Sequence, residues 1–187
     1  ELSNTEKLSE FFEELKRLKI SVQRPCINQC YAEFIPKENN FLYALGAIKN
    51  VGYEAISHVV KEREKNGKFT SISNFINRVN PKNINKLQLE ALVKAGAFDY
   101  IFVNRKVLYD NIPNIIQSSK SVYENRAQNQ TSLFLDDQKV SYLTQDKKLP
   151  DWPNNEMLSK EFESVGFYLS NHPLEDFKDI LDQYKTK

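Results

Sequence analysis

The sequence has few of the residues that build metal sites or disulfide frameworks. Among its 187 residues are two cysteines, Cys26 and Cys30, and two histidines, His58 and His172. A tetrahedral metal site needs four ligands close together, and both histidines are distant in sequence from the cysteine pair. We therefore expect Cys26 and Cys30 to be two reduced thiols, as in a cytoplasmic protein, and we expect no bound metal or cofactor. The alternatives are a disulfide between the two cysteines or a metal site to which they contribute half of the ligands.

Long apolar runs are also absent. No stretch of about 18 apolar residues is available to cross a membrane, and the N-terminus lacks the basic-then-apolar order of a signal peptide. The sequence therefore predicts a soluble cytoplasmic protein that does not act at a membrane. It begins at Glu1 and not at Met, which favours a piece of a longer chain. Its 40% hydrophobic and 12% aromatic residues can bury one core or two small ones.

Clustered acidic residues are lacking as well. A nucleotidyl transferase holds two metal ions with grouped carboxylates, whereas the acids here are spread over helix surfaces and polar segments. Asp136 and Asp137 are adjacent, but adjacent residues on an extended chain point in opposite directions. We therefore predict that the chain itself has no catalytic residues and no metal site.

The charge is nearly balanced overall, at +1, but it is unevenly distributed. Lys and Arg minus Asp and Glu give −1 for residues 1–40, +5 for 41–112 and −3 for 113–187. The middle segment is thus the one expected to meet phosphates, and a solvated basic face is the alternative.

One of the five glycines lies in a turn that favours phosphate binding. The stretch from Gly46 is expected to be the end of one helix, followed by a tight turn at Asn50-Val51-Gly52. A second, amphipathic helix is expected next, with an apolar face formed by Ala55, Ile56, Val59 and Val60. Gly52 permits positive φ and close approach of an anion to the helix N-terminus, and Val51 is expected to point inward. Lys49 is expected on the outer surface, together with Lys61 and Arg63. This pattern resembles the helix-hairpin-helix motif, although Asn50 stands where a glycine is usual.

A second turn of this kind is predicted at Gly96-Ala97. It follows a helix with Leu87, Leu89, Leu92 and Val93 and precedes another helix that opens at Asn104-Arg105. Paired hairpins grip the backbone of a duplex without reading bases, with Lys94 and Arg105 assisting here. Because the Asn50 side chain crowds the first turn, we expect the second to carry more of the phosphate binding. The alternative is that Gly96 only caps its helix.

The remaining patterns predict a mainly α fold. An amphipathic helix is expected from Ser3 to Ile20, a short β-hairpin near residues 31–43, and a short helix capped by Ser71 or Ser73 that ends before Pro81. Pro113 is expected to kink or break its helix and to start an irregular connector. After the connector, Trp152 is expected to anchor the chain, Gly166 to Leu169 to pack on the body, and a final helix to follow Pro173.

The connector carries an apolar peptide, Gln130-Thr-Ser-Leu133-Phe134, in a hydrophilic surrounding. Such a peptide folds back on its own domain or docks in a groove of another protein. The Gln-x-x-Leu-Phe pattern resembles the peptide by which bacterial polymerases and repair factors bind the sliding clamp. In that mode the amide of Gln130 hydrogen-bonds at the edge of the pocket, while Leu133 and Phe134 are the buried anchors.

The order of these segments closely resembles the alpha subunit of bacterial replicative DNA polymerase III. The resemblance rests on Leu45-Gly-Ala-Ile-Lys, on Leu89 to Asp99, on the Gln130 peptide and on Gly166-Phe-Tyr-Leu-Ser-x-His-Pro-Leu. Asn50 and Asn171 depart from it, since both stand where the family usually has glycine.

The resemblance implies a division of the chain: 1–40 would end the fingers domain, 41–112 hold a tandem helix-hairpin-helix unit, 113–150 form the connector with the clamp-binding peptide and 151–187 form a helical tail. It also implies duplex DNA, the sliding clamp (the beta subunit) and other holoenzyme subunits as partners, with Mg²⁺ at the catalytic centre of the parent polymerase. Two other classes of protein stay open. One is a DNA-repair factor with hairpins and a clamp peptide, and the other is an interaction scaffold whose hairpins are only packing turns.

Overall fold

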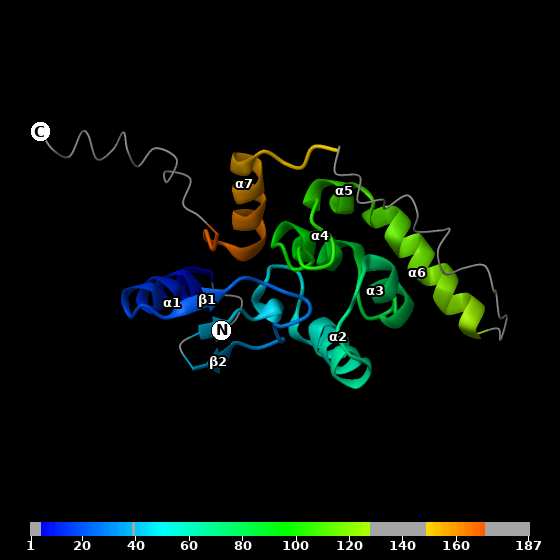
Figure 1. Ribbon diagram of the computed structural model, residues 1–187, viewed down its shortest axis with the longest axis horizontal. Coiled ribbons are helices and arrows are strands. Elements are labelled where there is room, and N and C mark those ends of the chain that lie inside the picture. Colours follow the sequence, from blue (N-terminus) through cyan, green and yellow to red (C-terminus); the bar gives the residue numbers. More distant parts are fainter. Residues whose placement is uncertain (1–4, 39, 128–148, 171–187) are drawn as a thin grey trace, which may run out of the picture.

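The computed structural model describes residues 5–38, 40–127 and 149–170 and confirms a mainly α fold. Figure 1 shows α1 and a small sheet at one end of the molecule and α6 at the other. The described helices are α1 (Thr5–Arg17), the 3-10 helix η1 (Leu45–Ala47), α2 (Tyr53–Asn66), α3 (Ile72–Arg78), α4 (Lys86–Lys94), α5 (Arg105–Asp110), α6 (Ile112–Ala127) and α7 (Asn154–Val165).

The predicted β-hairpin is present, and it belongs to a three-stranded sheet. Strands β2 (Ile35–Lys37) and β3 (Asn40–Leu42) pair antiparallel, with Pro36 opposite Phe41. Strand β1 (Ser21–Gln23) was not expected from the sequence. It pairs parallel to β3 with Val22 opposite Phe41, so the strand order is β1-β3-β2. Three residues without clear alternation are too short a pattern to predict a strand.

The described elements share one hydrophobic core. It runs from Leu8 on α1 through η1, α2 and α4 to Val165 at the end of α7 and Phe167 beyond that helix. The predicted boundary between residues 40 and 41 lies inside β3, so the segments on its two sides are joined by strand pairing as well as by this core.

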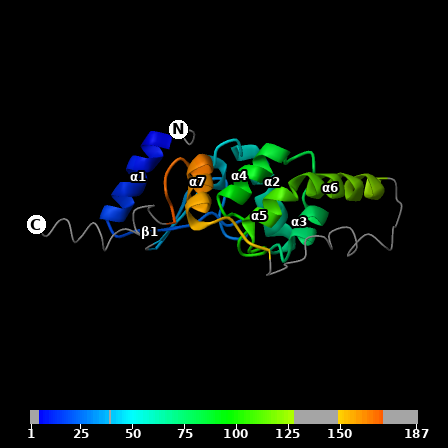
Figure 2. The same ribbon diagram turned by 90° about the horizontal axis from the view of Figure 1, so that it is seen from above.

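The helix that opens at Asn104-Arg105 ends before Pro113, as predicted: α5 stops at Asp110, and α6 begins at Ile112 with Pro113 as its second residue. The irregular connector predicted to start at Pro113 does not start there, because α6 continues to Ala127. Proline is tolerated in the first turn of a helix because the N–H that it lacks would have no partner there. Part of the predicted connector is therefore regular helix, and Figure 2 shows α6 extending away from the other helices.

The segment after the connector packs on the body as predicted. The Trp152 ring is buried and meets the Tyr109 ring edge-on at 5.4 Å. Phe167 lies between Phe12 and Tyr43, with ring centroids 4.9 and 6.3 Å away. Helix α7 thereby packs against α4, as Figure 1 shows. The final helix predicted after Pro173 lies outside the described residues.

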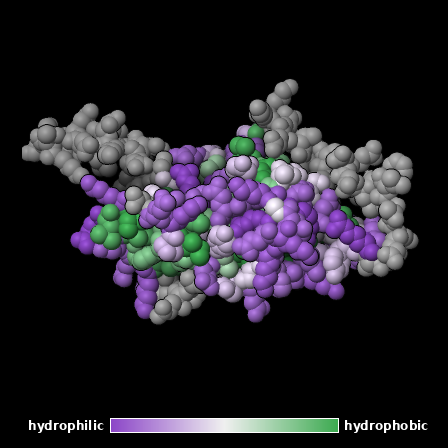
Figure 3. Space-filling view, turned by 60° about the horizontal axis from the view of Figure 1, so that its bottom comes forward, coloured by the Kyte–Doolittle hydropathy of each residue, from purple (hydrophilic) through white to green (hydrophobic). Residues whose placement is uncertain are grey.

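The face in Figure 3 is largely hydrophilic, with an apolar patch at the end of the molecule that carries α1 and the sheet. Phe11 and Leu18 are 42% and 56% exposed there, and the Phe11 ring packs against those of Phe34 and Phe41. Within the described part of the chain, no helix combines the length and the apolarity that crossing a bilayer requires.

Candidate nucleic-acid interface

The turn at Asn50-Val51-Gly52 has the backbone expected from its sequence. Asn50 has φ +66° and Gly52 has φ +77°, so Asn50 adopts the left-handed conformation that glycine more often supplies. The Val51 side chain is 0% exposed and ties the turn to the core. These observations confirm the predicted inward position of Val51 and the positive φ of Gly52.

Space is open on the outer side of this turn. A Cβ added to Gly52 would meet no atom within 4 Å. Gly52 is the N-cap of α2 and provides no side-chain cap, whereas α3, α4 and α5 are capped by the side chains of Ser71, Asn85 and Asn104. The N-terminus of α2 therefore presents backbone donors and the positive end of the helix dipole to an approaching anion.

Two hydrogen bonds from other helices hold the turn in place. The Lys49 N–H donates to the Ser164 carbonyl at the end of α7, at 2.8 Å. The Gln88 amide in the first turn of α4 donates to the Val51 carbonyl, at 2.7 Å. The turn is thus fixed from two sides while its outer side stays exposed.

The lysines predicted for the outer surface are there, but Arg63 is not. Lys49 and Lys61 are exposed, and neither has an ion pair among the described residues. Arg63 is only 6% exposed and donates to the carbonyls of Ile27 and Cys30, at 2.8 and 2.7 Å. The prediction for Arg63 is therefore wrong, because these two loop carbonyls would otherwise be buried without partners.

The second turn has a different structure. Gly96, with φ +78°, stands just past the end of α4, where its N–H donates to the Val93 carbonyl and the Ala97 N–H donates to the Leu92 carbonyl. This pair of bonds is a Schellman motif, in which the glycine ends the helix and the backbone donors are already used. Ala97 is fully buried, and its carbonyl accepts from the Ile27 N–H at 2.8 Å. The alternative interpretation of Gly96 as a helix cap is the one that the geometry supports.

The cations predicted to assist the second turn are paired within the protein. Arg105 is 5% exposed and forms two hydrogen bonds with the Asp99 carboxylate, at 2.9 and 2.6 Å. Burial raises the pKa of Asp99, although the Arg105 hydrogen bonds act in the opposite direction. The Lys94 ammonium lies 2.8 Å from a Glu163 carboxylate oxygen. Burial lowers the pKa of Lys94, but the bond to Glu163 and nearby charges outweigh it and leave that pKa raised.

The backbone N–H groups at the N-terminus of α5, the helix that follows the second turn, also have hydrogen-bond partners within the protein. The N–H groups of Arg105 and Lys106 donate to the two carboxylate oxygens of Asp151, at 3.1 and 2.9 Å. The Val107 N–H donates to the Asn104 side chain at 2.9 Å. A carboxylate of the same chain therefore accepts from the first backbone N–H groups of α5. Which of the two hairpins carries more of the phosphate binding stays a prediction.

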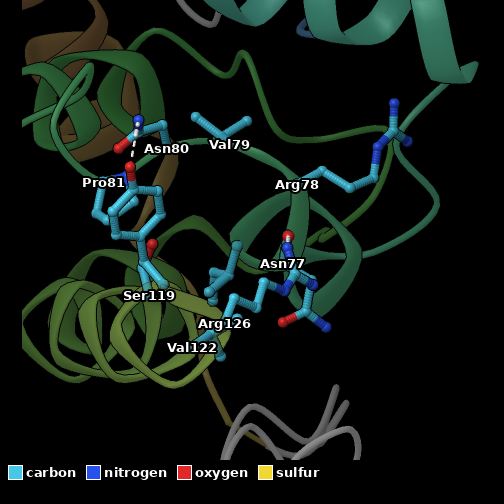
Figure 4. Close-up of a pocket in the computed structure, with 10 residues that line it drawn as sticks. Asn77, Arg78, Val79, Asn80, Pro81, Ser119, Val122 and Arg126 are labelled. Carbon is cyan, nitrogen blue, oxygen red and sulfur yellow. Dashed lines mark hydrogen bonds between the residues drawn. The ribbon is translucent and has the colours of Figure 1, made fainter. Parts of the chain in front are cut away.

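A pocket of about 340 Å³ with a mixed polar and apolar lining lies between the end of α3 and α6 (Figure 4). Asn80 on the α3 side meets the Tyr123 hydroxyl of α6, and Arg126 donates to the Asn77 carbonyl. Arg78 lies at the margin of the view and extends away from α6, because its guanidinium binds Glu62. The pocket's side chains thus join α6 to α3, and no cluster of acids lines it.

Two residues of this region were missed from the sequence. Gln88 was detectable in part, since Asn85-x-x-Gln88 matches a capping box, and the structure has both of its hydrogen bonds. Nothing in that pattern indicates that the same amide reaches Val51. Asp151 had no detectable signal, because it stands about 45 residues after the helix that it caps.

Comparison with known proteins agrees with this geometry. A family model described as a helix-hairpin-helix motif matches residues 19–108, which include both turns. The chain is 37% identical over 186 residues to the DNA polymerase III subunit alpha of Caulobacter vibrioides (strain NA1000 / CB15N) and 36% identical over 189 residues to that of Borreliella burgdorferi. Each alignment covers 100% of this chain and 16% of the relative. The subunit of the same name from Campylobacter jejuni is 35% identical over 97% of the chain.

The chain is homologous, over its whole length, to a segment of the DNA polymerase III alpha subunits. It spans about 16% of the length of these relatives. The homology confirms the family resemblance and, with the matched motif, a helix-hairpin-helix unit within a polymerase III alpha sequence.

Other predictions for this polymerase segment remain open. Gln130, Leu133 and Phe134 lie outside the described residues, so the clamp-binding peptide stays a prediction. Among residues 5–38, 40–127 and 149–170, no group of three or more His, Cys, Asp or Glu side chains is arranged to hold a metal ion.

Proposed function

We propose that this chain is a non-catalytic, DNA-binding segment of a DNA polymerase III alpha subunit that holds the sugar-phosphate backbone of duplex DNA. The observation that carries the proposal is the turn at Asn50-Val51-Gly52. It has open space at Gly52, it begins α2 without a side-chain cap, and it lies beside the exposed Lys49. Backbone donors and a nearby lysine suit a phosphate and carry no information about base sequence.

The contact that we propose includes fewer residues than the one expected from the sequence. Lys49, Asn50 and Gly52 are exposed, while Val51 is the buried support of the turn. Lys94, Gly96, Ala97 and Arg105 act in the proposal as the scaffold behind the first turn, because their donors and charges are used inside the protein.

Duplex affinity as a function of salt tests this function. The 187-residue chain is titrated with a fluorescent duplex of random sequence at several salt concentrations, and with a second duplex of different sequence. A phosphate binder loses affinity steeply as salt rises and treats both duplexes alike. A scaffold, in which the hairpins are only packing turns, gives no duplex binding at low salt and would refute the proposal.

We further propose that Gln130, Leu133 and Phe134 bind the sliding clamp. The support is the Gln-x-x-Leu-Phe pattern in a polymerase homologue, and a clamp that encircles DNA would turn each rebinding of the duplex into a near-intramolecular event. Replacing Leu133 and Phe134 together by Ala is expected to abolish clamp binding in a titration, with duplex affinity retained. Unchanged clamp affinity would show that the assignment of the peptide is wrong.

In this proposal the parent protein is the enzyme. Template-directed DNA synthesis, with Mg²⁺ at grouped carboxylates, would belong to parts of the polymerase other than this chain. The segment would act in the cytoplasm together with the other holoenzyme subunits. It would contribute binding to duplex DNA and thereby processivity.

A further inference from the structure

The Gln88 side chain joins two backbone groups that are far apart in sequence. Its Oε1 accepts from the Asn85 N–H at 2.7 Å, which completes the capping box of α4. Its Nε2 donates to the Val51 carbonyl at 2.7 Å. The oxygen thus meets a donor and the nitrogen meets an acceptor, so both ends of the amide are satisfied.

The second bond fixes the direction of the Gly52 N–H. In a trans peptide the C=O of one residue and the N–H of the next point in opposite directions, and the described chain has no cis peptide bonds. With the Val51 carbonyl bound to Gln88 on α4, the Gly52 N–H points away from α4. Gly52 has open space on its outer side, where no atom would meet an added Cβ within 4 Å.

This peptide would turn easily without such a bond. Rotating the plane between Val51 and Gly52 changes only ψ of Val51 and φ of Gly52, and glycine accepts both signs of φ. The buried Val51 side chain holds the turn to the core but does not determine the direction of the peptide that follows it. The hydrogen bond from Gln88 supplies that constraint.

We propose that Gln88 is a positioning residue for phosphate binding, which holds the Gly52 N–H toward the DNA backbone without touching the DNA. The inference rests on the proposed function, because it concerns how the Gly52 N–H of the same turn is held in the orientation that binds phosphate. A donor that is already oriented in the free protein does not have to be ordered when the ligand binds. Losing the hydrogen bond from Gln88 therefore lowers the affinity for DNA without removing a contact to it.

Two variants separate this role from helix capping. Gln88→Met keeps the length of the side chain but removes the donor to Val51, and also its part of the capping box. Asn85→Ala removes the N-cap side chain of α4 and leaves the bond from Gln88 to Val51 possible. Both are expected to lower the melting temperature, and Gln88→Met more so because it loses two hydrogen bonds. Only Gln88→Met is expected to weaken duplex binding, by roughly 3- to 10-fold, as one lost hydrogen bond permits.

The Gly52 amide supplies a readout that a role in helix capping alone would not change, and the salt dependence checks that no charged contact with the DNA is lost. Gln88→Met removes no charge, so its affinity should fall equally at all salt concentrations and the salt slope should stay that of the wild type. In ¹H–¹⁵N spectra, the Gly52 amide should shift in Gln88→Met and hold its position in Asn85→Ala. Wild-type affinity in Gln88→Met, or equal losses of affinity in both variants, would overturn the positioning role while leaving DNA binding intact. Absence of duplex binding by the wild-type chain would overturn the proposed function and this inference together.

Discussion

Arg105 fills the space beside Gly96, so the glycine and the guanidinium occupy adjoining parts of one packed turn. A Cβ built on Gly96 would overlap the Arg105 guanidinium and lie 2.9 Å from a carboxylate oxygen of Asp99. The glycine that resembled a phosphate-binding residue is therefore needed to make room for an internal ion pair. Gly52 has a nearly equal φ and open space around it. The two turns share a sequence pattern, but side chains of the protein pack against Gly96 and none lies within 4 Å of a Cβ added to Gly52.

Replacing each glycine by alanine is expected to separate these roles. Both changes place a Cβ at positive φ, which costs about 1–3 kcal/mol. Gly96→Ala should be the more destabilising, because the Cβ also displaces the pair of Arg105 and Asp99. Gly52→Ala should reduce duplex affinity more than its stability loss explains, since the Cβ stands where a phosphate would approach. Urea unfolding and duplex titration of both variants test this, and a greater affinity loss in folded Gly96→Ala would contradict it.

Arg105→Met is expected to lower the stability of the protein and to leave its affinity for duplex DNA nearly unchanged. The change leaves the Asp99 carboxylate and the Lys94 carbonyl without their donor, at a cost of about 2–3 kcal/mol in the free energy of unfolding. Duplex affinity of the folded protein should stay within about twofold of the wild type. Adding Asp99→Asn should recover part of the lost stability, because the half-buried carboxylate no longer carries an unpaired charge. A large loss of affinity in a folded Arg105→Met protein would instead make Arg105 a DNA contact.

Local patterns account for what was predictable from the sequence. Gly67 with its positive φ at the end of α2 and Ser71 as the cap of α3 follow from residue type and spacing. The inward position of Val51 follows from the alternation of exposed and apolar residues in the turn. The partners of Arg105 and Arg63 did not follow, because a buried cation is specified by carbonyls and carboxylates that only folding brings close. Nor did the cap at Asp151, which crosses the whole connector.

Lys49→Gln is expected to weaken duplex binding through charge. Lys49 is exposed beside the turn, and its side chain has no ion pair within the described chain, so its ammonium is available to a phosphate. The slope of log affinity against log salt concentration should become less steep by about 1, which corresponds to one lost phosphate contact. Lys65→Gln is a matched control, because this exposed lysine lies at the opposite end of α2. Equal effects of the two changes would indicate a diffuse basic surface and not a contact at the turn.

Glu62→Gln is expected to destabilise the protein at neutral pH and to lose its effect in acid. Burial raises the pKa of Glu62, but hydrogen bonds from Asn66 and Arg78 outweigh it, so that this pKa is lowered from 4.5. The bond to Arg78 is 3.0 Å long and joins α2 to α3. Because the folded state favours the ionised carboxylate, the stabilisation is fully present above the ordinary carboxyl pKa and disappears as pH falls through the lowered value. Removing the charge should lower the free energy of unfolding near pH 7, although the Gln oxygen can still accept from Arg78.

Urea unfolding from pH 7 to pH 3 measures this dependence. The difference in unfolding free energy between wild type and Glu62→Gln should be constant well above the ordinary carboxyl pKa and shrink as pH falls below it, because the unfolded chain takes up its proton first and the folded wild type follows at lower pH. Glu64→Gln is the matched control, because Glu64 is exposed on the same helix and should show little effect at any pH. A difference for Glu62→Gln that persists unchanged at pH 3 would mean that side-chain packing, and not the charge of Glu62, joins the two helices.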